Sequence, residues 1–176
     1  PILWSLQSGA PIGDAAVLNA MATEIAVSEH LRNIEGGLDQ IDVRCPAAAG
    51  NQIVIVKLRG RVEGQSKTAL VAALSGPAVH PKLAIGVDED IDPDDLRDVG
   101  WSIASRTHAE SDVAIIDGTH VNSADAISPL VAPGERVGAK WFIDSTMPPL
   151  TQPAKRDTFA RAVPKNLANV RLEDFL

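Results

Sequence analysis

The sequence predicts an α/β domain, in which short buried strands alternate with helices. Residues 83–87 form a fully apolar run, which is typical of a strand in a parallel sheet. A helical pattern follows, and then a second apolar run at residues 112–117. This succession of strand, helix and strand predicts a right-handed crossover between parallel neighbours. The length of 176 residues suits one domain.

The first helix is expected to begin at Asp14, which can cap it, and to end near residue 33. The apolar residues of its predicted buried face recur at helical spacing; they are Leu18, Met21 and Ile25. Two strands should follow. Residues 39–44 alternate between polar and apolar side chains, and residues 53–58 are a largely β-branched run.

A second helix is expected before Gly76, where a glycine and a proline end it. Three of its residues share one predicted buried face; they are Leu70, Val71 and Leu74. Further along, residues 141–143 predict a last short strand, and residues 154–162 predict a short final helix.

The start of the helix after residue 87 carries the clearest local signal in the chain. Asp92 can cap it, and Pro93 suits the first helical position. Acidic residues follow in the first turn, where they favour the positive end of the helix dipole. Arg106 lies near the predicted end, where positive charge is favoured. The predicted buried stripe consists of Leu96, Val99 and Ile103.

Composition excludes several classes of function. The net charge is −7 and no basic patch is visible, so nucleic acid binding has no electrostatic support. No apolar run reaches about 18 residues, so no membrane span is expected, and we expect a cytoplasmic protein. The single cysteine, Cys45, excludes an internal disulfide and is expected to be a small buried residue. The four histidines show no metal-ligand spacing.

Seven acidic residues lie between positions 88 and 98, directly after the apolar run. The favoured interpretation is that Asp92, Asp94 and Asp95 cap the following helix while the others face solvent. A loose magnesium site is one alternative. Another is a phosphoacceptor pocket with a carboxylate pair, a group from the next strand and a lysine. Its residues would be Asp88, Asp90, Asp117 or Thr119, and Lys140.

Two blocks of the chain resemble the C-terminal domain of the UbiD-like decarboxylases. The first opens with Lys82 and runs through the acidic stretch 87–92 and the segment 101–106 to the apolar run after Ser111. The second is residues 139–146, AKWFIDST, where the family has Lys-x-Gly-Ile-Asp-Ala-Thr; Phe142 replaces the glycine and Ser145 the alanine. The resemblance implies a three-layer α/β domain, with a mostly parallel or mixed sheet and helices on both faces. It implies a domain over residues 1–146, and an extension, 147–176, that packs on it or on a partner.

Enzymes of this family use prenylated flavin mononucleotide (prenylated FMN) to remove or add a carboxylate on unsaturated or aromatic acids. Their catalytic acid–arginine–acid set, their divalent metal and most cofactor contacts lie in an earlier domain. The resemblance therefore implies a UbiD-like catalytic partner chain that holds all of these, and a homo- or hetero-oligomer. This chain would close the active site and mediate oligomer contacts, with no catalytic residue or metal ligand of its own.

The resemblance also implies binding residues. Lys82 would approach a cofactor phosphate, and the substrate would meet Trp141, Phe142 and Asp144. In physical terms, a lysine offers a point charge for phosphate and the two aromatic rings offer an apolar wall for a planar acid. The alternatives are core packing for the two rings and a solvated strand end for Lys82. Two other functions stay open: a non-catalytic assembly module, and the magnesium-binding phosphoacceptor.

Overall fold

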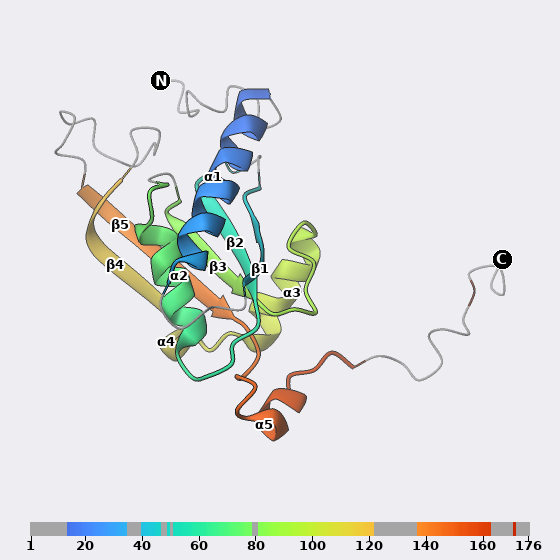
Figure 1. Ribbon diagram of the computed structural model, residues 1–176. Helices are drawn as coiled ribbons and strands as arrows, with labels where there is room; N and C mark the ends of the chain where they lie inside the picture. The colour runs from blue at the N-terminus through green and yellow to red at the C-terminus, as the bar shows by residue number, and fades with distance from the viewer. Residues whose placement is uncertain are drawn as a thin grey trace.

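Figure 1 shows the computed structural model, which describes residues 14–34, 40–46, 49, 51–78, 81–121, 137–162 and 171. Within them, five strands form one mixed sheet with helices on both faces, as predicted. The strands are β1 (Gln40–Arg44), β2 (Ile53–Leu58), β3 (Leu83–Val87), β4 (Val113–His120) and β5 (Val137–Ser145). The helices are α1 (Asp14–Arg32), α2 (Gln65–Ser75), α3 (Leu96–Arg106), α4 (Ala109–Asp112) and α5 (Pro153–Asp157). None of the described helices is long and apolar enough to cross a membrane.

The strand order is β1-β2-β3-β5-β4. Strands β2, β3 and β5 are parallel, while β1 and β4 are antiparallel at the two edges. The predicted crossover from β3 to a parallel neighbour at residues 112–117 is therefore wrong. That segment is β4, and β5 separates it from β3. The reason is burial: β3 is buried along its whole length, whereas Ile115 of β4 is exposed, as suits an edge strand.

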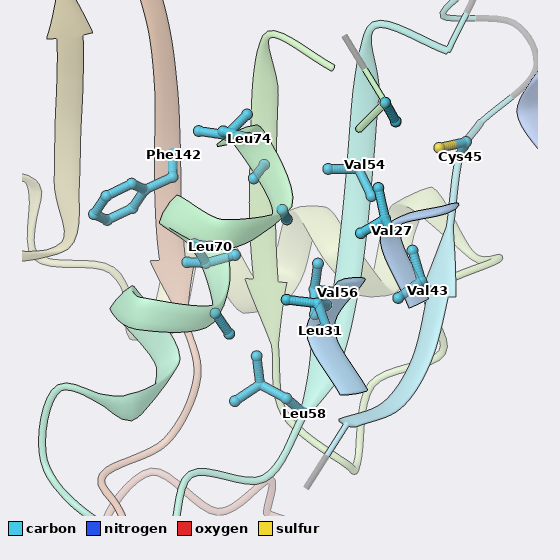
Figure 2. Packing of buried hydrophobic residues seen from close by; sticks show 14 of the residues in the cluster. Val27, Leu31, Val43, Cys45, Val54, Val56, Leu58, Leu70, Leu74 and Phe142 are labelled. Atoms are coloured by element: carbon cyan, nitrogen blue, oxygen red, sulfur yellow. The ribbon is translucent and has the colours of Figure 1, made fainter. Parts of the chain in front are cut away.

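Helices α1 and α2 cover one face of the sheet, and α3 lies on the other (Figure 1). The larger core lies beneath α1 and α2, and Figure 2 shows its aliphatic packing. The smaller core lies beneath α3 and contains alternate residues of β2 and β3 with Val99 of the helix. Side chains on the two faces alternate along β3, so a strand of five apolar residues supplies both cores.

The predicted buried face of α1 is wrong. Leu18 is 65% exposed, and Met21 and Ile25 are exposed with it. The buried face consists instead of Ala20, Thr23, Val27 and Leu31. The first two residues of this face, Ala20 and Thr23, have small side chains. The hydroxyl of Thr23 donates to the carbonyl of Asn19 at 2.8 Å, so its burial leaves no unpaired donor.

Helix α2 packs with Leu70 and Leu74, as predicted, but Val71 is exposed and two alanines complete its buried face. Leu70 lies directly over Gly86 of β3. A Cβ at that position would come within 3.1 Å of the leucine Cδ1 atom, tighter than ordinary contact, so the glycine permits the close approach of helix and strand.

Helix α3 begins later than predicted. Its cap is Asp95, whose carboxylate accepts from the backbone N–H of Arg97 at 2.9 Å. Asp92 instead accepts from Asp94 within the preceding turn. Leu96 is exposed, whereas Val99, Ser102 and Arg106 are buried. Several acidic residues in succession can each cap a helix, and the local pattern did not distinguish between them.

Candidate functional site

A cavity of about 550 Å³ lies beyond the carboxyl ends of β2 and β5, where ligands of α/β proteins are usually found. The N-terminus of α2 borders it on one side. The end of α3 and residues 146–159 border it on the others. The charged residues in its wall are three basic and three acidic: Lys67, Arg106 and Lys155, and Glu63, Asp112 and Asp144. Equal numbers of the two signs give the cavity no clear preference for the charge of a ligand.

Asp144, a predicted substrate contact, lines this cavity and is largely buried. One of its carboxylate oxygens accepts from the Ser66 hydroxyl at 2.5 Å. The other accepts from the backbone N–H and the hydroxyl of Thr146, at 3.1 and 2.7 Å. The carboxylate thus ties the end of β5 to the first turn of α2, which has no acidic residue of its own. Negative charge there is favoured by the helix dipole.

Lys82 and Trp141 lie toward the other end of the parallel strands. The backbone N–H of Trp141 donates to the carbonyl of Lys82 at 2.9 Å, so these two predicted residues are neighbours. Trp141 is half-buried and packs against the core beneath α3. Asp144 is three residues further along β5, about 10 Å away at the rise of a strand. The structure therefore joins the backbones of Lys82 and Trp141 and separates both residues from Asp144.

Phe142 is 5% exposed and lies in the larger core, which also contains Leu70 and Leu74 of α2 (Figure 2). It does not line the cavity. In this structure the ring packs the sheet against the helix, and the geometry adds no support to its predicted contact with a substrate.

The acidic stretch 88–98 is mostly paired with arginines. Asp88 is fully buried against Arg156, which reaches both of its oxygens. Asp90 receives two parallel hydrogen bonds from Arg106, at 2.8 and 2.6 Å. The other pairs are Glu89 with Arg59, Asp94 with Arg44, and Asp98 with Arg161. The prediction of a helix-capping role is thus right for Asp95. The prediction that the remaining acidic residues face solvent is wrong for Asp88.

These pairs shift the acidities of two carboxyl groups. Hydrogen bonds from Arg106 lower the pKa of Asp90, outweighing its partial burial. The pKa of Asp98 is also lowered. Desolvation opposes ionisation there, but hydrogen bonds from Arg161 and from the backbone N–H of Asp92, together with the arginine charge, outweigh it. Both carboxyl groups are thereby held in the ionised form that the arginines require.

The two metal-binding alternatives gain no support from the described ranges, where no three His, Cys, Asp or Glu residues are placed to hold an ion. Lys140 is buried and donates to the carbonyl of Leu74 at 2.8 Å, and desolvation lowers its pKa. It lies four residues before Asp144 on β5, while Gly86, which is paired with Asp144, immediately precedes Val87 and Asp88. The lysine of the predicted phosphoacceptor site therefore lies at a different position along the strands from Asp88 and Asp90, which follow the end of β3.

Cys45 is buried, as predicted. Desolvation, together with the charge of Glu24, raises the pKa of its thiol to about 12. A thiol with this pKa is protonated at neutral pH and is a poor nucleophile, so it is a packing residue of the core.

Sequence patterns missed the arginines that complete this region. Arg156 and Arg161 lie 68 and 63 residues from their acidic partners, and no local periodicity joins positions so far apart. Ser66 was missed for the same reason, being 78 residues from Asp144. The surplus of acidic residues over nearby basic residues was the available signal, since buried charges must be paired.

Comparison with known proteins identifies the domain. Residues 16–145 match the family model of the 3-octaprenyl-4-hydroxybenzoate carboxy-lyase C-terminal domain. The chain is 38% identical over 95 residues to an anhydromevalonate phosphate decarboxylase of Methanocaldococcus jannaschii, covering 53% of this chain and 21% of that protein. It is 29% identical over 161 residues to a phenolic acid decarboxylase of Sedimentibacter hydroxybenzoicus, covering 90% of this chain and 32% of that protein.

Solved structures agree. The UbiD-class enzyme HmfF from Pelotomaculum thermopropionicum, in complex with FMN, superposes with a TM-score of 0.73 and 25% identity, over 92% of this chain and 34% of that one. The vanillic acid decarboxylase of Sedimentibacter hydroxybenzoicus in its closed form superposes with a TM-score of 0.70 and 26% identity. The match covers 88% of this chain and 31% of that one. The chain thus spans about a fifth to a third of the length of these relatives. By its fold and its family match, the chain belongs to the UbiD family of carboxy-lyases and represents the C-terminal domain.

Proposed function

We propose that this chain is the C-terminal portion or a subunit of a UbiD-like decarboxylase acting on an unsaturated or aromatic carboxylic acid. The family match over residues 16–145 carries the proposal. A partner chain holds prenylated FMN, the divalent metal and the catalytic glutamate and arginine set. Bound there, the cofactor supplies the chemistry of carboxylate removal. The role of this chain is to close the site, exclude water and contribute to oligomer contacts.

We place the contacts with the cofactor and substrate at the Lys82 end of the sheet. The backbones of Lys82 and Trp141 are hydrogen-bonded there, so adjacent strand positions carry a positive charge and an aromatic ring. This combination suits the phosphate of a flavin nucleotide beside a planar acid. Asp144 is a second candidate for a substrate contact, from the separate cavity, although the side chains and backbone of the chain itself already occupy its oxygens.

Affinity purification of this chain from its native cells tests the assignment. The expected result is a co-purifying UbiD-like catalytic chain and the absorbance of a modified flavin in the eluate, with decarboxylase activity only in the complex. A colourless eluate that contains this chain alone would overturn the proposal.

Lys82→Ala tests the proposed phosphate contact within the reconstituted complex. We expect flavin to bind about tenfold more weakly, as for the loss of one charged hydrogen bond, while the two chains remain associated. Arg97→Ala is the control, because it removes an exposed positive charge of α3 that does not line the cavity. Equal flavin affinity in both variants would exclude Lys82 as the phosphate contact.

A second candidate function, a non-catalytic assembly module, is favoured by the exposed apolar stripe of α1. Val17, Leu18, Met21 and Ile25 lie on this stripe, and exposed apolar groups at helical spacing mark contact surfaces. Sedimentation of the purified chain distinguishes the two functions. Stable self-association without any partner chain, abolished by Leu18→Glu, would favour the assembly module.

A further inference from the structure

Residues 146–162 form a strap that leaves β5, passes the carboxyl ends of the strands and forms one wall of the cavity. Six of its residues line the cavity; they are Thr146, Met147, Pro148, Pro149, Lys155 and Phe159. The strap is fixed to the loop before α2 by two backbone hydrogen bonds. Leu150 donates to the carbonyl of Gly60 at 3.0 Å, and Thr151 donates to that of Arg61 at 3.2 Å.

The middle of the strap is held by a buried attachment. Arg156 has a side chain that is only 10% exposed and pairs with Asp88, which is fully buried. Arg156 also donates to the carbonyl of Pro148 at 2.9 Å, and Asp88 accepts from the backbone N–H of Met147 at 3.0 Å. Each charge is therefore paired and further hydrogen-bonded. Breaking such a pair leaves a buried charge without compensation, so this attachment is strong.

The end of the strap is held by a second, more exposed attachment. Arg161, whose side chain is 40% exposed, pairs with Asp98. Its guanidinium carbon lies 4.2 Å from the centroid of the Trp101 ring, and that of Arg106 lies 5.0 Å from the same ring. Arg106 also donates to the carbonyl of Phe159 at 3.1 Å. Water competes with exposed ion pairs, so this attachment is the weaker of the two.

We propose that residues 157–162 are a releasable end of the strap, which swings away from Trp101 and opens the cavity while Arg156 keeps the rest of the strap attached. The buried Asp88–Arg156 pair is the fixed point of this movement. Phe159 lies beyond it and lines the cavity, so release of the end removes part of the wall. Residues 147–153 stay in place, because their hydrogen bonds to the loop before α2 do not depend on Arg161.

Amide hydrogen exchange of the full chain, followed by mass spectrometry, tests this movement in the Arg161→Ala variant. The backbone N–H groups of Thr158, Phe159 and Ala160 donate to carbonyls three residues earlier, so their exchange reports on the order of this end. We expect exchange in residues 157–162 to become about three- to tenfold faster, from the loss of an exposed ion pair and a cation–π contact. Exchange in residues 147–153 should stay unchanged.

Arg97→Ala is the matched control, because it removes an exposed arginine of α3 next to Asp98 and keeps the Arg161–Asp98 pair intact. This variant should leave the amide exchange of residues 147–153 and 157–162 unchanged. Asp98→Asn breaks the same ion pair from the other side and should reproduce the effect of Arg161→Ala. Unchanged exchange in residues 157–162 in both Arg161→Ala and Asp98→Asn would overturn the proposal, and so would an equal rise in residues 147–153.

Discussion

The acidic stretch 88–98 and helix α1 have opposite compositions, and both take positions contrary to expectation. The acidic stretch carries seven carboxylates, yet one of them is fully buried and another receives two hydrogen bonds from a buried arginine. Helix α1 carries an apolar stripe at helical spacing, yet that stripe is exposed and a face of smaller residues is buried. In these two regions, local composition does not decide which side chains are buried. The residues that pack against them from distant parts of the chain decide it.

The largest expected effect comes from removing the partner of the buried carboxylate. Arg156→Ala should lower the free energy of unfolding by about 3–5 kcal/mol, because Asp88 would remain buried without its cation. Urea denaturation measures the change. Arg97→Ala, on an exposed position, should change stability by no more than about 0.5 kcal/mol. If both variants were equally stable, the acidic stretch would be a solvated surface after all.

The two faces of α1 can be compared with one substitution at two positions. Leu31→Ala should cost about 2–5 kcal/mol, because Leu31 is fully buried and the change leaves a cavity. Leu18→Ala, on the same helix, should cost no more than about 0.5 kcal/mol in the isolated chain. Thermal or urea unfolding of the two variants measures the difference. A reversed order would show that the originally predicted face is the buried one.

The Asp90–Arg106 pair predicts a dependence of stability on pH. The pKa of Asp90 is lowered in the folded state, so its contribution is present above the unfolded-state value of about 3.9 and is lost as the pH falls through the lowered value. Stability should therefore fall as the pH decreases below about 5. In Asp90→Asn this decrease should be shallower, as urea midpoints measured across the acidic range would show. An identical slope in both proteins would argue against the pair.

The smallest effect is expected at the exposed edge of the same acidic stretch. Arg44 pairs with Asp94 at 3.1 Å, where the Asp94 side chain is largely exposed and that of Arg44 is partly exposed. Its hydrogen bond to Asp94 raises the pKa of Arg44. Asp94→Ala should cost about 0–1 kcal/mol, and the difference should disappear in high salt, because exposed pairs are screened. A loss comparable to that of Arg156→Ala would remove the distinction between the buried and exposed parts of the stretch.

The sequence by itself determined most of the elements. The apolar run 83–87 is the central strand because only a strand buried on both faces has this composition. The β-branched run 53–58 and the alternating residues before it are strands, and the second helix ends at the predicted glycine. The family was also within reach, because the blocks at 82–117 and 139–146 carry its pattern.

Only the tertiary structure decided how these elements meet. The order β3-β5-β4, the buried face of α1 and the arginine partners of Asp88 and Asp98 all depend on residues that are far apart in the chain. It also separated Asp144 from Lys82 and placed Phe142 in the core. The physical reason is the range of the forces involved. Periodicity and capping act within a few residues, whereas burial and ion pairing are settled when distant segments pack together.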